Sequence, residues 1–226
     1  MYRSKVYFAP IHKMNITYQD ERILVINKPS GLPVLPDGWE KDSPYLVKML
    51  EEEFGKIFVV HRLDKVTSGV MVFARDAESH RALNIQFENR EVEKIYHAIV
   101  EGHPKWEEKT AKHPLRVNVG HKHRTAVDDR NGKPSETRFR LRELYQAAAL
   151  VEATPKTGRT HQVRVHARAL GHTLVGDILY GAAESKIIVR PALHALTLTF
   201  AHPVTQERLT FKAEYPPDFA RALKFL

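Results

Sequence analysis

The stretch His61-Arg62-Leu63-Asp64, followed closely by Thr67-Ser68-Gly69-Val70, carries the most information in this sequence. It places one carboxylate beside an arginine and just ahead of a glycine. The residues that come next, Val70-Met71-Val72-Phe73, are apolar and partly β-branched, which is typical of a buried strand. The pattern predicts a polar loop, with Asp64 in it, that enters a strand. Taken alone, a loop aspartate most often only bonds nearby backbone or a neighbouring arginine.

The charge balance narrows the class of partner. The 226 residues include 35 Lys and Arg against 27 Asp and Glu, a formal net charge of +8. A basic surface attracts polyanions, among which nucleic acid is the commonest. A basic protein without such a partner has the same composition, so charge alone leaves both interpretations open.

The absence of cysteine excludes disulfides, thiolate catalysis and Cys-ligated metal centres. No apolar run approaches the roughly 18 residues that a membrane helix needs. The basic start, Met1-Tyr2-Arg3-Ser4-Lys5, is not followed by an apolar signal core. These features together predict a cytoplasmic protein.

Hydrophobic periodicity predicts an α+β protein. Helices are expected from Ser43-Pro44 to Gly55, after Asp76, from Thr160 to Gly171, and after Pro216. Strands are expected at 23–26, 58–60, 70–73, 95–100, 139–144, 147–154, 196–200 and 209–212. Consecutive strands with short turns favour an antiparallel or mixed sheet over repeated βαβ units. Residues 1–14 are a tail or a first strand, and the polar stretch 103–135 is a solvated loop or an RNA-facing arm. Without a repeat or linker, residues 1–226 are expected to form a single domain.

Further segments stand at fitting distances from the Asp64 stretch. They are Asn27 to Leu32, Thr157 to His166, Gly171 to Gly181, and Leu193-His194-Ala195 with His202-Pro203 after it. In this order, from about residue 18 to about 218, the chain resembles the RluA-type RNA pseudouridine synthases. The pairing of His-Arg-Leu-Asp and Thr-Ser-Gly with Gly-Arg-Thr-His-Gln is the specific part of the resemblance; no single segment is.

The resemblance implies a fold and a reaction. The fold is a mixed, largely antiparallel central sheet with flanking helices and a catalytic cleft across its middle. The reaction breaks the N1–C1′ bond of a uridine in RNA, turns the base and rejoins it through C5, with no cofactor and no metal. The family's catalytic aspartate corresponds to Asp64, its active-site tyrosine to Tyr96, and the arginine that pairs with the aspartate to Arg164.

Elementary chemistry agrees with a single essential carboxylate. Breaking a glycosidic bond needs a group that stabilises positive character at C1′ or attacks it. Glycosidases use a second carboxylate because they also activate water, whereas an isomerisation needs no water. An arginine within reach keeps a carboxylate ionised and oriented, and Tyr96 offers a flat face for the detached uracil. Whether Asp64 attacks the sugar or the base is left open.

RNA contacts are expected around this centre. A structured uridine must be flipped out to be reached, and Arg62 is expected to hold the displaced strand or fill the vacancy. Phosphate or strand contacts are further expected from the residues His61, Lys122, Arg124, Arg159 and His161. The core strand begins near Ile23, so no separate N-terminal RNA-binding domain is expected, and the choice between rRNA and tRNA falls to the loops 30–45 and 103–135. A monomer is expected.

Other interpretations stay in view. One is a non-catalytic RNA-binding or remodelling protein on the same fold. Another is a hydrolase, which requires a second carboxylate beside Asp64, with Asp177 and Asp76 as candidates. Tyr96 can be a packing residue and Arg164 an ordinary surface arginine. A metal site is disfavoured, because His161 and His166 are five residues apart rather than the four that share a helix face.

Overall fold

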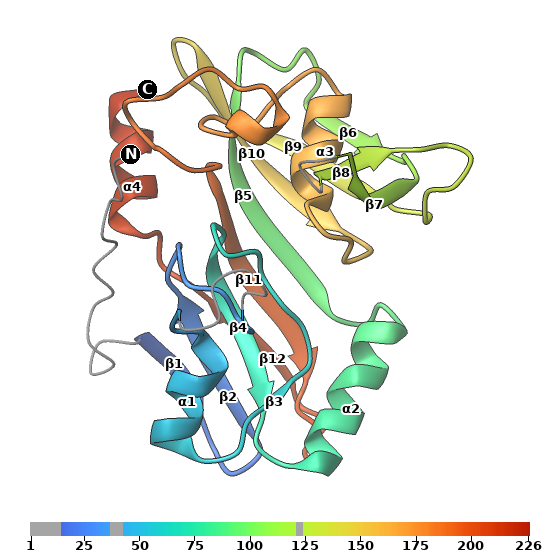
Figure 1. Ribbon diagram of the computed structural model, residues 1–226, viewed down its shortest axis with the longest axis vertical. Helices are drawn as coiled ribbons and strands as arrows, with labels where there is room; N and C mark the ends of the chain where they lie inside the picture. The colour runs from blue at the N-terminus through green and yellow to red at the C-terminus, as the bar shows by residue number, and fades with distance from the viewer. Residues whose placement is uncertain (1–14, 37–42, 121–123) are drawn as a thin grey trace.

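The computed structural model of this chain describes residues 15–36, 43–120 and 124–226. The expectation for residues 1–14 lies outside this part. The described residues build a ten-stranded sheet with the order β1-β2-β4-β11-β5-β10-β9-β6, to which β12 is added on β11 and β3 on β4 (Figure 1). Of these pairings only β4 with β11 is parallel. The expected mixed, largely antiparallel α+β sheet is thereby confirmed.

The strand bounds follow the expected pattern closely. The strands of the large sheet are β1 (Asn15–Gln19), β2 (Ile23–Lys28), β3 (Phe58–Val59), β4 (Ser68–Ala74), β5 (Glu93–Glu101), β6 (Glu108–Ala111), β9 (Thr137–Leu144), β10 (Ala148–Pro155), β11 (Leu193–Ala201) and β12 (Arg208–Lys212). A separate ribbon pairs β7 (Leu115–Val119) with β8 (Arg124–Val127). The helices are α1 (Leu46–Phe54), α2 (Ala77–Glu88), α3 (Gln162–Ala169) and α4 (Pro217–Phe225), with one 3₁₀ turn at Ile178–Tyr180.

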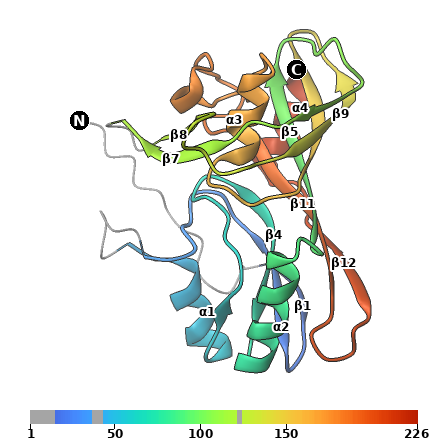
Figure 2. The same cartoon turned by 90° about the vertical axis from the view of Figure 1, so that its right-hand side faces the viewer.

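The polar stretch 103–135 is not simply the expected solvated loop, and the alternative of an RNA-facing arm stays a prediction. It contributes β6 to the sheet edge and forms the β7–β8 ribbon beside α3. Most side chains of this ribbon are exposed, so its strands lack the apolar alternation by which a half-buried strand is recognised. Figure 2 shows the ribbon and α1 projecting on the same side of the sheet.

The start of α1 also differs from expectation. Ser43 does not cap the helix; Tyr45 is the N-cap residue, and no side chain caps it. The first backbone N–H groups of the helix instead bond to a distant turn, Leu46 to the carbonyl of Pro33 and Val47 to that of Val34. Tertiary contacts therefore replace the cap that local sequence favours. Asp76 does cap α2, accepting from the Ser79 amide at 2.8 Å, as expected.

Gly69 explains the glycine of the Thr-Ser-Gly segment. It pairs with Ala195 where β4 meets β11, and it has a φ of +123°. A Cβ placed on Gly69 would lie 2.1 Å from the Ala195 carbonyl oxygen. Only glycine permits this close approach of two backbones. The contact fixes where the strand that follows the Asp64 loop enters the sheet.

None of the helices in the described segments has the length and apolarity needed to cross a membrane.

Candidate active site

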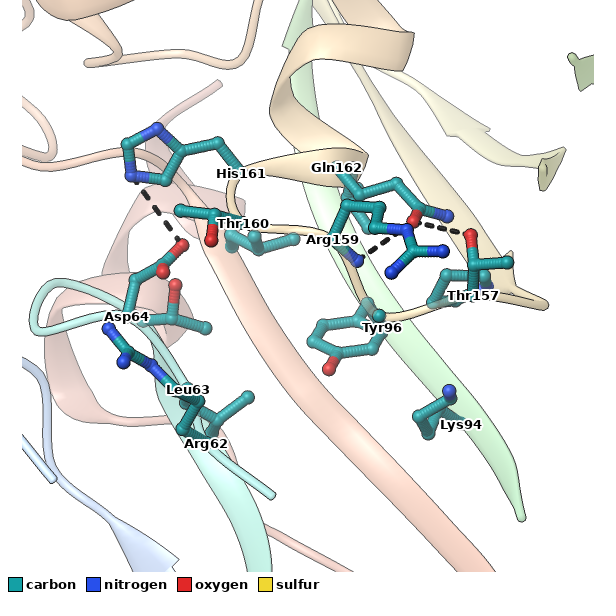
Figure 3. A pocket seen from close by; sticks show the side chains of 15 residues that line it. Arg62, Leu63, Asp64, Lys94, Tyr96, Thr157, Arg159, Thr160, His161 and Gln162 are labelled. Atoms are coloured by element: carbon teal, nitrogen blue, oxygen red, sulfur yellow. Dashed lines mark hydrogen bonds and ion pairs between the residues drawn. The ribbon is translucent and has the colours of Figure 1, made fainter. Parts of the chain in front are cut away.

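The pairing register of three neighbouring strands aligns the residues beneath the site. Gly69 on β4 pairs with Ala195 on β11, which pairs in turn with Tyr96 on β5. The loop that carries Asp64 leads into this row from β3, and the loop before α3 faces it. Between them lies a pocket of about 130 Å³ (Figure 3). Figure 3 shows Arg62 and Asp64 on one side of this pocket and Tyr96 with Arg159 on the other.

The Asp64 loop is anchored by a buried lysine. Lys28, at the end of β2, is fully buried, and its Nζ donates to the carbonyls of Pro29, Leu32 and Lys65 at 2.7, 2.8 and 3.3 Å. The Gly31 amide bonds to the same Lys65 carbonyl at 2.7 Å. Burial lowers the pKa of Lys28 to about 7, an effect to which the Arg190 charge adds and which Asp64 opposes. The segment 27–32 thus shapes the wall of the site and holds the residue next to Asp64.

A second buried basic side chain holds the same loop from the other side. Arg190 donates to the carbonyl of Val66 at 3.3 Å and to the hydroxyl of Ser68 at 3.3 Å. Asp218, in the first turn of α4, neutralises it through two hydrogen bonds of 2.7 and 3.0 Å. The loop from Asp64 to Ser68 is therefore fixed by two buried basic side chains that hydrogen-bond to its backbone and to the Ser68 hydroxyl. Such preorganisation restricts the positions that the Asp64 carboxylate can take.

His161 faces Asp64 from the opposite wall. Its Nε2 lies 3.8 Å from the Asp64 Oδ2, and its Nδ1 lies 2.8 Å from the Tyr180 hydroxyl. The Tyr180 oxygen already accepts the Thr125 amide proton at 3.0 Å, so its own proton is free for Nδ1. Burial lowers the pKa of His161, although the charge of Asp64 opposes this. At neutral pH a neutral imidazole, protonated on Nε2, therefore faces the carboxylate.

Tyr96 lines the same pocket and keeps its phenolic proton. Burial raises its pKa, and the nearby negative charge of Asp64 adds to this effect. The hydroxyl is therefore a hydrogen-bond donor across the physiological range. Its ring packs against two hydrophobic clusters, one on either half of the sheet.

Arg164 does not make the expected pair with Asp64. Its guanidinium donates to both carboxylate oxygens of Asp177 at 2.7 Å, and both side chains are almost completely buried. The same guanidinium lies 4.9 Å from the centre of the Tyr180 ring. Because α3 begins at Gln162, Arg164 lies in its first turn and points toward the Gly176-Asp177 turn rather than toward the pocket. Arg164 thus supports Tyr180, which contacts His161.

The residues expected to face RNA are dispersed. Arg62, Arg159 and His161 line the pocket with Asp64. His61 lies in an adjoining groove, stacked on Phe87, and burial lowers its pKa to about 3, so it is not a cation at neutral pH. Arg124 lies away from the pocket, beside the later turns of α3. Lys122 is outside the described residues.

The hydrolase alternative loses its structural basis here. Among the described residues, Asp64 is the only carboxylate that lines the pocket. Asp177 is occupied by Arg164, and Asp76 caps α2. In residues 15–36, 43–120 and 124–226, no three His, Asp or Glu side chains gather in a group that could hold a metal ion.

Comparison with known proteins decides the family. Residues 22–169 match the family model of RNA pseudouridylate synthase. The chain is 40% identical over 207 residues to the dual-specificity RNA pseudouridine synthase RluA of Escherichia coli, covering 90% of this chain and 93% of that protein. The chain belongs to the RNA pseudouridylate synthase family. It is therefore an isomerase that acts on RNA, as the resemblance of its motifs implied.

Other members of the RNA pseudouridylate synthase family agree. The chain is 35% identical to the ribosomal large subunit pseudouridine synthase D of Zymomonas mobilis, over 94% of this chain and 73% of that one. The structure of human RNA Pseudouridylate Synthase Domain Containing 1 superposes with a TM-score of 0.79 at 29% identity, covering 96% of this chain and 90% of that chain. The fold expected for this synthase is thus confirmed by a solved structure.

Three supporting residues of this synthase are not evident from the sequence. The pattern around Lys28 predicts only a turn, Tyr180 stands in a quoted segment without a role, and Arg190 belongs to no quoted segment. The sequence offers one indication for Arg190: it lies three residues before the Leu193-His194-Ala195 segment, which carries part of the family resemblance. Each of the three also has a partner that is remote in sequence, at Lys65, His161 and Val66, and no local pattern identifies those contacts.

Proposed function

We propose that this protein isomerises specific uridines in rRNA or tRNA to pseudouridine, with Asp64 as the essential residue. The observation that carries the proposal is the pocket in which Asp64 is the only carboxylate among the described residues, facing Tyr96 and His161. One carboxylate fits an isomerisation, in which the detached base rather than water returns to the sugar. The relatives are named for both RNA classes, one as dual-specificity and one as acting on the large ribosomal subunit.

The residues of the pocket divide the work. Asp64 stabilises or attacks the C1′ centre, or attacks the base, as the N1–C1′ bond breaks, and no second carboxylate is required. The uracil stays in the pocket against the Tyr96 ring, whose hydroxyl can donate to it. After the base turns, C5 bonds to C1′, the proton on C5 is lost to water, and N1, which has lost its bond to C1′, takes up a proton. Arg62, which lines the pocket beside Asp64 and is exposed, contacts the strand from which the uridine is flipped.

Tritium release tests the chemistry directly. RNA labelled with [5-³H]uridine loses its tritium to water only when C5 forms the new bond. We expect release from labelled tRNA or rRNA by the wild type, and none above background by Asp64→Asn. The responding RNA identifies the substrate. No release by the wild type from either RNA, with RNA binding retained, would instead favour a non-catalytic RNA-binding protein.

The role of Arg62 is tested with the same assay. Arg62→Ala is expected to slow release from folded RNA while leaving the fold intact, because Arg62 has no hydrogen bond or ion pair to the described residues. Thermal unfolding provides the check on folding. Unchanged turnover on folded RNA would remove Arg62 from the proposed flipping step.

A further inference from the structure

A second groove adjoins the Asp64 pocket and shares part of its lining. It has a volume of about 440 Å³, and the residues common to both cavities include Arg62, Lys94, Tyr96 and Arg159. Beyond Tyr96 the groove extends between the end of α2 and the loop before α3, away from Asp64. A chain bound with one unit in the Asp64 pocket can therefore continue into this groove.

The groove is strongly cationic. Its lining contains the five cations Arg62, Arg90, Lys94, Lys156 and Arg159 and a single carboxylate, Glu88. Lys156 is partly neutralised by Glu136, 2.7 Å away. Within the described part of the chain, Arg90, Lys94 and Arg159 form no ion pair. The unpaired positive charge therefore lies in two places. Lys94 and Arg159 line both cavities where they meet, and Arg90 lines only the groove.

Lys94 and Arg159 are both partly buried, yet neither has an anionic partner among the residues that the structure describes. Lys94 lies two residues before Tyr96 on β5, so both side chains face the same side of the sheet. Burial lowers the pKa of Lys94, which reflects an ammonium without a nearby anion. The Nε of Arg159 is shielded from solvent and has no acceptor in the described segments. Native proteins seldom leave buried polar atoms unsatisfied, and where they do, a ligand is one explanation.

The wall of the groove suits a nucleotide better than a simple anion. His61 and Phe87 stack there with ring centres 4.8 Å apart and planes at 21°. Because burial keeps His61 neutral, with a pKa of about 3, the stack adds flat apolar surface and no charge. Cations beside an aromatic surface are the combination that binds a phosphate together with its base.

We propose that this groove binds the nucleotide adjacent to the target uridine, with its phosphate between Lys94 and Arg159. This groove proposal depends on the proposed function in one respect: that function identifies the nucleotide in the Asp64 pocket as the target uridine. Binding of the RNA phosphate itself follows from the groove. On this proposal, the ammonium of Lys94 has no anionic partner among the described residues of the free protein because the RNA phosphate is its partner.

The test measures RNA affinity separately from turnover. Fluorescence anisotropy of a labelled tRNA transcript, followed across a range of KCl concentrations, gives the salt slope of binding. Each phosphate contact contributes roughly 0.7 to 0.9 to this slope. We expect Lys94→Met and Arg159→Gln each to weaken binding and reduce the slope by about that amount. Lys94→Arg, which keeps the charge, should retain the wild-type slope.

Stability separates this role from a structural one. Lys94→Met removes a partly buried charge without a partner, so its free energy of unfolding should equal or exceed that of the wild type. Lys224→Met, on the exposed face of α4, changes net charge equally and should leave the slope unchanged. An unchanged slope in folded Lys94→Met would overturn the proposal, and so would a slope that falls equally in Lys224→Met.

Two further readouts keep the hypotheses apart. If the wild type releases tritium while the Lys94 and Arg159 variants keep the full slope, the groove proposal fails and the proposed function stands. If no RNA is isomerised but the slopes change, the proposed function fails and the groove proposal stands. A site for free phosphate is the competing outcome: inorganic phosphate would then raise the melting temperature of the wild type and not of Lys94→Met, with equal RNA binding by both.

Discussion

The Nε2 of His161 lies 3.8 Å from the Oδ2 of Asp64, and the orientation of the imidazole is set from outside the pocket. The Tyr180 hydroxyl bonds to Nδ1 of the same ring and accepts the amide proton of Thr125 on β8. A chain of two hydrogen bonds thus connects the β7–β8 ribbon to the histidine that faces the Asp64 carboxylate. His161 is the N-cap residue of α3 and has a left-handed backbone conformation, with a φ of 56°.

Tyr180→Phe tests this chain. Phenylalanine keeps the ring that packs over Arg164 but leaves the buried Thr125 amide and the His161 Nδ1 without their partner. We expect a loss of about 1–3 kcal/mol in the free energy of unfolding and slower tritium release at unchanged RNA affinity. Urea denaturation and the release assay measure the two effects. Wild-type stability and turnover together would show that the hydroxyl is dispensable.

The buried Arg164–Asp177 pair should matter for folding. Asp177→Asn leaves the guanidinium charge of Arg164 in the interior without a counter-ion, which typically costs about 3–5 kcal/mol. Glu93→Gln is the matched control, because Glu93 and Arg208 form an exposed pair at 3.6 Å that is worth about 1 kcal/mol or less. Urea denaturation compares the two variants. Equal, small losses would contradict the importance assigned to the buried pair.

Gly69→Ala is expected to be severely destabilising. The added Cβ would meet the Ala195 backbone at 2.1 Å, and the φ of +123° is strained for any other residue. We expect a loss of at least about 2 kcal/mol in the free energy of unfolding, with reduced turnover because β4 carries the Asp64 loop.

Gly55→Ala separates crowding from backbone strain. Gly55 ends α1 with a φ of +74°, but no other atom lies within 4 Å of the position that a Cβ would take. Its replacement should therefore cost about 1–3 kcal/mol, from backbone conformation alone, and less than the replacement of Gly69. Thermal or urea unfolding of both variants gives the comparison. A Gly69→Ala variant as stable as Gly55→Ala would mean that β4 and β11 can separate freely.

His194 predicts a pH dependence of stability. The side chain is fully buried between Ser68 and the Ala213 carbonyl, and burial lowers its pKa to about 4. An unfolded histidine has a pKa near 6.5. Between these values the unfolded chain binds the additional proton, so stability is complete above about pH 6.5 and falls as the pH drops toward 4.

The variant His194→Gln should show a smaller slope of unfolding free energy between pH 6.5 and 4 than the wild type, by up to about 1.4 kcal/mol per pH unit. Urea denaturation at a series of pH values measures this. Its stability at pH 8 is the reference, because the substitution also changes packing. Parallel curves for the two proteins would exclude His194 as the titrating group.

Local sequence determined much of this protein. Apolar runs such as Val70-Met71-Val72-Phe73 predicted nearly every strand of the large sheet, because a strand buried on both faces has a continuous apolar pattern. Asp76 and Gly55 marked helix ends through side-chain and backbone preferences that act within a few residues. The spacing of the Asp64, Tyr96 and His161 segments indicated the family and its reaction.

Only the tertiary structure decided how Asp64 is held and what surrounds it. Arg164, Lys28 and Arg190 each have a partner at least 13 residues away in the chain, at Asp177, Lys65 and Val66, and these contacts exist only once the segments that carry them are packed together. The polar β7–β8 ribbon could not be recognised from the sequence, because mostly exposed strands do not alternate apolar and polar residues. Sequence patterns report burial and local conformation; ion pairs, buried carbonyl contacts and the groove beside Tyr96 arise only when distant segments are brought together.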